Sequence, residues 1–458
     1  MRIRVGIIDS LIETDNPQIL KVLSERWSFP VQGYQFTPAY RRGHWDGKKK
    51  FITAGGKFKT GLLNDVLADL AKINCTPKLD YEYPAELKPD ACQPVLEKYQ
   101  LFDYQIKAVN DCLAKKRALI ISPTGSGKTL MLASLLNSLP YGKVVVLFDE
   151  RSILTQTYEY LTKNLSFEDV GINLGGDYKN GRIMLSTVQS IEKIFDTHLN
   201  EAHTLIVDEV HKFCRGEIAV AAIQSFPNAQ FRFGFTATMP DDTIGKLTLK
   251  GAFGDEITTK STQELIEDKK LAKPIIQIIE YKDQLKAEDV DDTYANLYDK
   301  FIVNSDKRNG MIINLAAKIS ASNSKAKVCI LVKNLAHLEI LKRAIPNCYT
   351  LEGINSTSER RRAIHGFVES SKAAFLIGTK VLQTGINIEE ITHLINARGL
   401  KDKIPTIQGL GRGLRKMDGK SSVMVYDFMD EIPYMDEHSK QRIKHYRKEG
   451  HEINWIKL

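Results

Sequence analysis

A glycine-rich loop between an apolar run and a helical pattern constrains this fold most. The loop reads Pro123-Thr124-Gly125-Ser126-Gly127-Lys128-Thr129, with an apolar strand pattern at 118–121 before it and a helical pattern at 130–136 after it. Strand, loop and helix in this order are the context that a phosphate-binding loop needs. The general pattern has glycine at position 122, where this chain has Ser122. The sequence therefore predicts a nucleotide site on an α/β sheet.

The residues of this loop have distinct expected roles. Gly125 and Gly127 let the backbone come close to phosphate oxygens, so that the N–H groups of Thr124, Ser126 and their neighbours face the anion. Lys128 is expected to bridge the β- and γ-phosphates, and Thr129 is expected to ligate Mg²⁺. We therefore expect ATP and Mg²⁺ as cofactors.

Two adjacent acids follow another apolar run. Leu205-Ile206-Val207 reads as a strand, and Asp208-Glu209-Val210-His211 follows it. Ligands of open α/β sheets bind at the carboxyl ends of strands, which is where these acids would lie. We expect Asp208 to hold Mg²⁺ through its water shell and Glu209 to polarise the attacking water as general base.

The chain divides by pattern into three parts. Its 458 residues suggest roughly three domains at about 150 residues each. We assign 1–97 to a small N-terminal α+β domain, 98–265 to a first α/β domain, and 266–458 to a second one that ends in a basic tail. From residue 101 onward, short apolar runs, such as those at 143–148 and 393–396, alternate with helical patterns, which is typical of parallel sheets in α/β layers.

Composition limits the compartment and the partners. Apolar runs are strand-sized and none approaches the ~18 residues of a membrane span, and Asp9 comes too early for a signal-peptide core. We therefore expect no membrane partner and a cytoplasmic protein. Six well-separated cysteines lack the CxxC spacing of a zinc site, so we expect free thiols. A net charge of +8 permits a nucleic-acid partner without requiring one.

A pair of arginines belongs to the second α/β part. Arg412 and Arg415, in Gln408-Gly409-Leu410-Gly411-Arg412-Gly413-Leu414-Arg415, share one face if the segment is helical. An arginine at the γ-phosphate stabilises transition-state charge and is worth about 10³–10⁵ in rate. We expect this role for both arginines, with ATP between the two α/β domains; a solvated basic helix is the alternative.

The N-terminal part carries a basic, aromatic stretch. Between 41 and 60 there are seven Lys or Arg and one Asp, and six aromatics interleave with them between 34 and 58. Phosphate attraction next to stacking surfaces is typical of a nucleic-acid face. The candidates are Arg41, Arg42, Lys48, Lys49 and Lys50. The alternative is a β-rich unit with core aromatics, among them Trp45 and Phe51, and solvated lysines.

The motifs, taken in order, resemble those of the superfamily 2 helicases. The loop at 123–129, DEVH at 208–211, Thr236-Ala237-Thr238 and the segment at 408–415 resemble motifs I, II, III and VI. Weaker matches are Phe102-Asp103-Tyr104-Gln105 before the loop, 146–151 for motif Ia, 186–190 for Ib, and 377–380 with 384–387 for V. The resemblance covers about residues 98–430.

This resemblance implies a fold and residue roles. The fold is two tandem RecA-like domains, parallel sheets flanked by helices, after a small α+β domain. Gln105 would read adenine, and Arg151, Thr187 and Thr379 would contact phosphates of one DNA strand. Thr236 and Thr238, with His211 and Gln408, would couple the ATP site to that strand. Gly385 and Asn387 would complete the nucleotide site and help to position motif VI.

The N-terminal pattern narrows the resemblance. Trp45-Asp46-Gly47-Lys48 followed by Gly56-Lys57-Phe58-Lys59-Thr60-Gly61 resembles the UvsW-like branch-migration helicases of tailed phages. That family implies an ATP-hydrolysing DNA helicase or translocase that remodels forks and four-way junctions in recombination, replication or repair, with possible partners among other recombination or replication proteins. An RNA helicase, the motor subunit of a restriction or repair nuclease, and a nucleotide-gated clamp remain as alternatives.

Overall fold

The computed structural model describes residues 1–83, 87–139, 142–289, 292–353, 355–379, 388, 390–401 and 422–457. The chain forms two compact units. One comprises residues 1–123 and 127–259, and the other comprises residues 124–126 and 260–458. The domain limits expected at 97 and 265 stay predictions.

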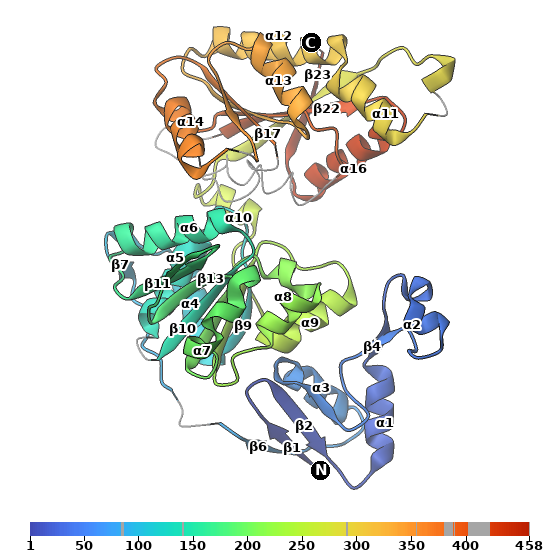
Figure 1. The fold of residues 1–458 in the computed structure, drawn as a ribbon, viewed down its shortest axis with the longest axis vertical. Coiled ribbons are helices and arrows are strands. Elements are labelled where there is room, and N and C mark those ends of the chain that lie inside the picture. The colour runs from blue at the N-terminus through green and yellow to red at the C-terminus, as the bar shows by residue number, and fades with distance from the viewer. Residues whose placement is uncertain are drawn as a thin grey trace. The chain divides into compact units, whose positions relative to one another are not determined.

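The first unit begins with a small α+β domain (Figure 1). Its four-stranded sheet has the order β5-β2-β1-β6, in which β1 pairs antiparallel with β2 and parallel with β6. Ile3, Val5, Phe58, Leu62 and Val66 are buried in its core. The elements are β1 Arg2–Val5, β2 Asp9–Glu13, α1 Pro17–Arg26, β3 Ser28–Pro30, α2 Pro38–Arg41, β4 Lys48–Lys50, β5 Lys57–Lys59, α3 Leu63–Ala71 and β6 Lys78–Tyr81.

The rest of the first unit is an α/β domain around an eight-stranded sheet of order β12-β11-β13-β10-β14-β15-β9-β16. Its main elements are α4 Asp103–Lys115, β9 Arg117–Ile121, α5 Lys128–Ser138, β10 Lys143–Phe148, α6 Arg151–Glu159, β11 Val170–Leu174, β12 Asp177–Lys179, β13 Ile183–Thr187, α7 Phe195–His198, β14 Ala202–Val207, α8 Glu217–Ile223, β15 Phe231–Thr236, α9 Thr243–Phe253 and β16 Glu256–Thr258, after a short hairpin of β7 Val95–Leu96 and β8 Tyr99–Gln100. Only β12 pairs antiparallel, with β11.

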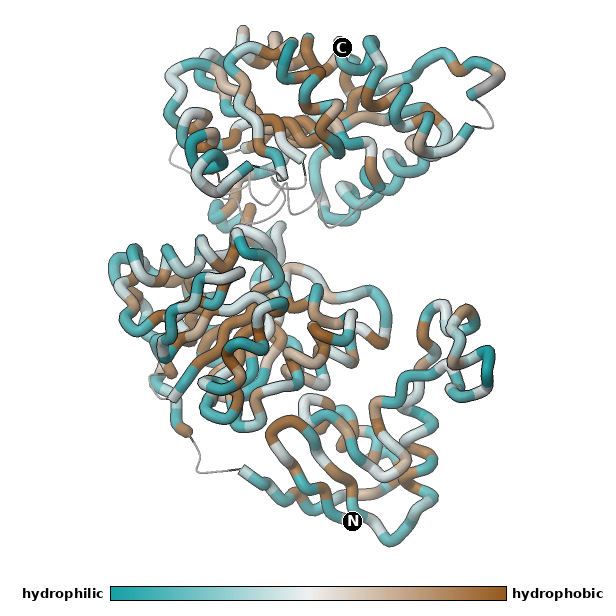
Figure 2. The backbone as a smooth tube through the Cα atoms, in the orientation of Figure 1, coloured by the Kyte–Doolittle hydropathy of each residue, from teal (hydrophilic) through white to brown (hydrophobic). Residues whose placement is uncertain are grey.

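Both faces of this sheet are covered. Along β10, Val144, Val146 and Phe148 belong to one buried cluster, and Val145 and Leu147 belong to the other. Successive side chains of a strand point to opposite faces, so an uninterrupted apolar run fits a strand with helices on both sides. Figure 2 shows the apolar residues gathered along the central strands of the sheets.

The N-terminal domain is docked on α9 of the same unit. Ile244 and Leu247 of α9 pack against the N-terminal core. Lys250 Nζ lies 2.7 Å from Asp65 Oδ2 and 3.0 Å from Asp255 Oδ1, and Asn64 Nδ2 donates to Asp255 Oδ2 over 2.7 Å. Apolar contact and a shared ion-pair cluster therefore hold the two domains together.

The second unit contains a seven-stranded parallel sheet of order β19-β20-β18-β21-β22-β17-β23. Its elements are α10 Thr262–Glu267, β17 Lys273–Tyr281, α11 Tyr294–Tyr298, α12 Asp306–Ser322, β18 Lys327–Leu331, α13 Leu335–Ala344, β19 Cys348–Leu351, α14 Thr357–Glu369, β20 Ala374–Gly378, β21 His393–Asn396, β22 Ser422–Asp430, α16 Met435–Lys448 and β23 Glu452–Ile456. The expectation of two tandem RecA-like α/β domains after a small α+β domain is thus confirmed.

The basic tail is an integral part of this second domain. Arg442 of α16 is 1% exposed and its Nε donates to Asp427 Oδ2 of β22 over 2.9 Å. β23 then pairs in parallel with β17. Arg442 therefore anchors the helix to the sheet, while Lys440 lies exposed beside Asp436.

Across the described residues, no helix is long and apolar enough to cross a membrane. All six cysteines are free, as expected.

Candidate active site

The phosphate loop joins β9 to α5. Gly125 and Gly127 have φ values of 85° and 81°, a region that residues with a Cβ rarely adopt, so both positions favour glycine. Ser122, at the position where the general pattern has glycine, is buried; its N–H donates to Thr236 O over 2.9 Å. Its Oγ accepts a hydrogen bond from Thr259 Oγ1 over 2.8 Å. Ser122 thus links β9 to β15 and supports the base of the loop.

Lys128 begins α5 and lies between the loop and the acidic pair. Its Nζ donates to Ser122 O over 3.2 Å and lies 3.9 Å from Glu209 Oε1. At 3.9 Å the contact with Glu209 is longer than a direct hydrogen bond, so the ammonium keeps donor capacity for an anion in the loop. The structure therefore brings the predicted phosphate ligand and the predicted base together.

The acidic pair follows β14. The N–H of Asp208 donates to Leu147 O of β10 over 3.0 Å, and the N–H of Glu209 donates to Asp208 Oδ1 over 3.0 Å. Glu209 has a φ of 46°, which is uncommon for a residue with a Cβ and is typical of functional sites. The backbone therefore turns sharply and fixes both carboxylates beside Lys128.

The two carboxyl groups have opposite pKa shifts. Burial raises the pKa of Asp208, and the negative charge of Glu209 adds to that shift. Burial also opposes ionisation of Glu209, but the positive charge of Lys128 and the contact with His211 outweigh it and lower its pKa. Glu209 therefore stays ionised, as a group that orients a water must.

One oxygen of Glu209 is left without a protein donor. Among the described residues, its buried Oε2 has no hydrogen-bond partner. The nearest donor, Nδ1 of His211, lies 3.4 Å away and is engaged with Thr236, so we regard this contact as electrostatic. A buried carboxylate oxygen with spare accepting capacity suits a bound water, and the adjacent Asp208 supplies the hard oxygen ligand that Mg²⁺ prefers.

A hydrogen-bond chain connects the acidic pair to β15. His211 Nδ1 lies 2.9 Å from Thr236 Oγ1, which donates to Thr238 O over 2.8 Å. Because the Thr236 hydroxyl hydrogen is used, His211 must be the donor in the first contact. Three of the predicted coupling residues are thus in direct contact.

Gln105 lies beside the loop, on the first turn of α4. It is buried, and its Oε1 accepts from Phe102 N over 2.9 Å. Its amide nitrogen is so close to Gly127 that a Cβ there would lie 2.4 Å from it. The structure therefore places Gln105 beside the phosphate loop, whereas adenine recognition stays a prediction.

The residues of the α/β domains that are predicted to contact a DNA strand differ in accessibility. Arg151 is exposed at the start of α6, with its guanidinium against Gly175. Thr187 ends β13 and is 2% exposed, with its hydroxyl 3.2 Å from Ser190 Oγ. Thr379 follows β20 in the second unit and is also buried. Arg151 can contact a phosphate directly, whereas the two threonines present little side-chain surface.

The N-terminal basic residues also divide. Arg41, Arg42, Lys48 and Lys50 are exposed. Lys49 instead points toward the first α/β domain, where its Nζ donates to Thr248 Oγ1 over 2.9 Å, and burial lowers its pKa. The aromatics divide in the same way, because Phe51 and Phe58 are core residues while Phe36 and Tyr40 are exposed.

Five predicted site residues lie outside the described residues: Gly385, Asn387, Gln408, Arg412 and Arg415. One contact had no sequence signal. Lys212 Nζ bridges Asp149 and Glu150 at 3.0 and 2.6 Å, and so ties the motif II segment to the end of β10. In the sequence, a single lysine after DEVH does not indicate which distant acids it contacts, and Asp149 and Glu150 lie some 60 residues earlier.

Three family models match the chain. Residues 8–80 match the N-terminal domain of the DNA helicase UvsW, residues 98–241 match the res subunit of type III restriction enzymes, and residues 309–417 match the helicase conserved C-terminal domain. The last match includes the sequence positions of all five residues that the structure does not describe. The order of these matches agrees with the order of the motifs.

Known proteins resemble the whole chain or its motor part. It is 25% identical to the ATP-dependent DNA helicase uvsW of Enterobacteria phage T4, over 93% of each chain. It is 25% identical to the DNA 3'-5' translocase XPB2 of Sulfurisphaera tokodaii, over 71% of this chain and 80% of the relative. A fragment of a putative HsdR subunit of a type I restriction enzyme from Vibrio vulnificus shares the fold, with a TM-score of 0.57 at 19% identity, over 78% of this chain and 68% of that one. By its motifs, its domain order and these matches, the chain is a superfamily 2 helicase that resembles the UvsW-like helicases of tailed phages.

Proposed function

We propose that this chain is an ATP-dependent DNA helicase that moves branch points in forked and four-way-junction DNA during recombination, replication or repair. The observation that carries the proposal is the contact series from Lys128 through Glu209 and His211 to Thr236. It joins the phosphate loop to the segment that resembles motif III within one domain. ATP hydrolysis linked to movement on DNA needs such a connection.

ATP would contact the loop backbone at 124–127, with Lys128 at its terminal phosphates. Mg²⁺ would be held by Thr129 and, through water, by Asp208, and it would neutralise charge that develops on the phosphates. Glu209 is fixed, ionised and has an oxygen available for the attacking water. Arg412 and Arg415 are proposed to stabilise transition-state charge from the second domain.

DNA would be bound through its phosphates, since a motor that moves along any sequence cannot depend on base contacts. Arg151 of the first α/β domain and Arg41, Arg42, Lys48 and Lys50 of the N-terminal domain are exposed cations suited to this. Docking of the N-terminal domain on α9, the helix that follows Thr236–Thr238, supports the idea that it acts together with the motor.

The test is the rate of ATP hydrolysis at one fixed salt concentration without nucleic acid and with single-stranded DNA, duplex DNA, a fork, a four-way junction and single-stranded RNA. We expect the fork and the junction to stimulate most, and a labelled junction to be converted to its branch-migrated products only with hydrolysable ATP. Glu209→Gln should bind the junction without converting it. Strongest stimulation by RNA, or junction conversion by the Glu209→Gln variant, would contradict the proposal.

A motor subunit of a restriction or repair nuclease is the second candidate, because residues 98–241 match a restriction-enzyme family model. In the part of the chain that the structure describes, no group of three or more His, Cys, Asp or Glu side chains is placed to hold a metal ion. DNA cleavage on this second proposal would come from a partner subunit. Junction conversion by the purified chain alone favours the first candidate.

A further inference from the structure

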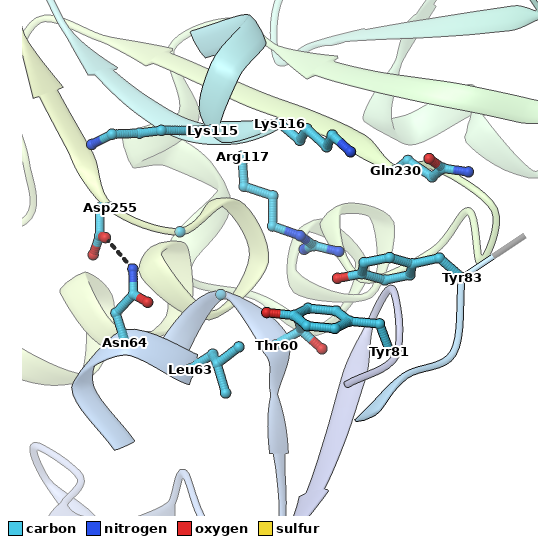
Figure 3. Close-up of a pocket in the computed structure, with 12 residues that line it drawn as sticks. Thr60, Leu63, Asn64, Tyr81, Tyr83, Lys115, Lys116, Arg117, Gln230 and Asp255 are labelled. Carbon is cyan, nitrogen blue, oxygen red and sulfur yellow. Dashed lines mark hydrogen bonds between the residues drawn. The ribbon is translucent and has the colours of Figure 1, made fainter. Parts of the chain in front are cut away.

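A cavity of the first unit lies between the N-terminal domain and the first α/β domain. Its volume is about 840 Å³, within the ~300–1,000 Å³ range of small-ligand sites. Tyr81 and Tyr83 form one wall, and Lys115, Lys116 and Arg117 form another (Figure 3). Neither the motifs nor the active site described above uses any of these residues.

The aromatic wall consists of two partly exposed rings. Tyr81 is 56% exposed and Tyr83 is 38% exposed. Their centroids lie 5.5 Å apart at 45°, so the pair forms a tilted, open surface rather than a closed stack. Large aromatic side chains held at the surface beside a cavity offer stacking area for a planar ligand.

The basic wall consists of three consecutive cations where α4 ends and β9 begins. Lys115 is exposed, and Lys116, with a φ of 62°, terminates the helix. Arg117 holds the two domains together, because its guanidinium donates to Ile7 O of the N-terminal domain and to Ala252 O of α9. The carboxylate at the rim, Asp255, is already bonded to Asn64 and Lys250. The wall therefore attracts anions.

The cavity is separate from the ATP site, although the same two elements build both. β9 has Arg117 at the cavity and leads at its other end into the phosphate loop, about 16 Å away for five strand residues. α4 has Lys115 at the cavity and Gln105, beside the loop, in its first turn. A ligand in the cavity would thus contact opposite ends of elements that form the nucleotide site.

We infer that this cavity binds an unpaired nucleotide of a DNA strand, with the base against Tyr81 and Tyr83 and the phosphate toward Lys115 and Lys116. Stacking rings beside cations match the base and phosphate of one nucleotide. A strand is favoured over a free nucleotide because the cavity opens beside a domain whose exposed lysines suit DNA phosphates. The inference rests on the proposed function, since it assigns the DNA a second contact.

Anisotropy of a labelled 15-nucleotide single strand, without ATP and at fixed salt, tests the inference. The full-length Tyr81→Ala/Tyr83→Ala variant should bind about 5- to 150-fold more weakly, the range for loss of one stacked base. Tyr81→Phe/Tyr83→Phe should bind like the wild type. Lys115→Glu should weaken binding, whereas Lys107→Glu, the same change on the same helix but outside the cavity, should have a clearly smaller effect.

A crosslink identifies the site directly. A strand that carries 5-iododeoxyuridine should crosslink to Tyr81 or Tyr83, and millimolar thymidine monophosphate should not remove the crosslink. If thymidine monophosphate removes the crosslink, the cavity is a site for a free nucleotide and the inference of a DNA strand is wrong. Equal affinity of the Ala and Phe variants for the single strand would also overturn the inference. Failure of the proposed function is distinguishable, because the wild-type protein itself would then neither bind the strand nor show DNA-stimulated ATP hydrolysis.

Discussion

Gly61→Ala should separate the N-terminal domain from the motor without altering either fold. Gly61 lies in the short helical turn before α3, and a Cβ there would be 2.1 Å from Lys250 O, 2.7 Å from Gly251 O and 2.8 Å from Gly254 N. All three atoms are backbone atoms of the first α/β domain, so no side chain can rotate away. The backbone of Gly61 does not have a positive φ, and alanine is therefore excluded by the close approach alone.

The magnitude follows from this geometry. The two backbones must move apart by about 1 Å, and such overpacking costs about 1–3 kcal/mol. The same movement loosens the contacts of Lys250 with Asp65 and Asp255. With an m-value near 1 kcal/mol per molar urea for a small domain, the unfolding midpoint of the N-terminal domain should fall by about 1 M or more.

Tryptophan fluorescence can follow this domain alone. The chain has three tryptophans; Trp27 and Trp45 lie in the N-terminal domain, and Trp455 lies in β23 of the second unit. In a Trp455→Phe background, the urea transition reports the N-terminal domain. The control is Gly55→Ala, where a Cβ would meet only Thr53 Oγ1, at 4.0 Å. Equal midpoints for the two alanine variants would refute the argument that Gly61 is required by domain docking.

Three other predictions follow from individual contacts. Lys128→Ala should abolish ATP hydrolysis, because the phosphates lose their cation. Glu209→Gln should also stop hydrolysis but should retain ATP binding, measured with a fluorescent analogue. Normal turnover in either variant would show that another group performs its role. Lys48→Gln/Lys50→Gln should flatten the slope of log K for DNA binding against log salt concentration by about 0.9 for each lost phosphate contact. Lys49→Gln should leave that slope unchanged and should instead lower the urea midpoint, because Lys49 Nζ donates a hydrogen bond to Thr248. Burial lowers the pKa of His337, which lies 2.9 Å from Asn309 Oδ1, to about 3. The neutral form's contribution to stability is therefore fully present above about pH 6.5, and it is lost at up to about 1.4 kcal/mol per pH unit as the pH falls toward 3. Urea midpoints of the second unit at pH 7 and pH 5 should show this loss in the wild type and a smaller loss in His337→Gln.

Some strands were predictable because their apolar runs are unambiguous. The run at 143–148 coincides with β10, and the run at 393–396 coincides with β21. β17 was not predicted, although Ile275, Ile276, Ile278 and Ile279 lie within it. Charged residues on both sides give its surroundings the composition of a linker. β23 escaped prediction because it is a short edge strand of mixed polarity after a basic helix, and its partner β17 lies some 180 residues earlier.

The contact between Lys128 and Glu209 was predictable because each follows a strand of the parallel sheet, Lys128 through the loop after β9 and Glu209 directly after β14. Parallel strands bring their carboxyl ends to one edge of the sheet. Long-range partners have no such signal. The burial of Arg442 against Asp427 and the bridge from Lys212 to Asp149 are set by packing of elements that the sequence does not place relative to each other.

The three lysines of β4 show why a charge cluster is not a single functional group. Side chains alternate along a strand, so Lys48 and Lys50 point to one side and Lys49 to the other. The exposure pattern of β4 follows this alternation, with Lys48 and Lys50 exposed and Lys49 half-buried. Consecutive lysines have low strand propensity, and nothing in the local sequence identifies the strand. Once the pairing of β4 with β3 is known, the alternation assigns two lysines to the solvent, where DNA can reach them, and one to the contact with α9.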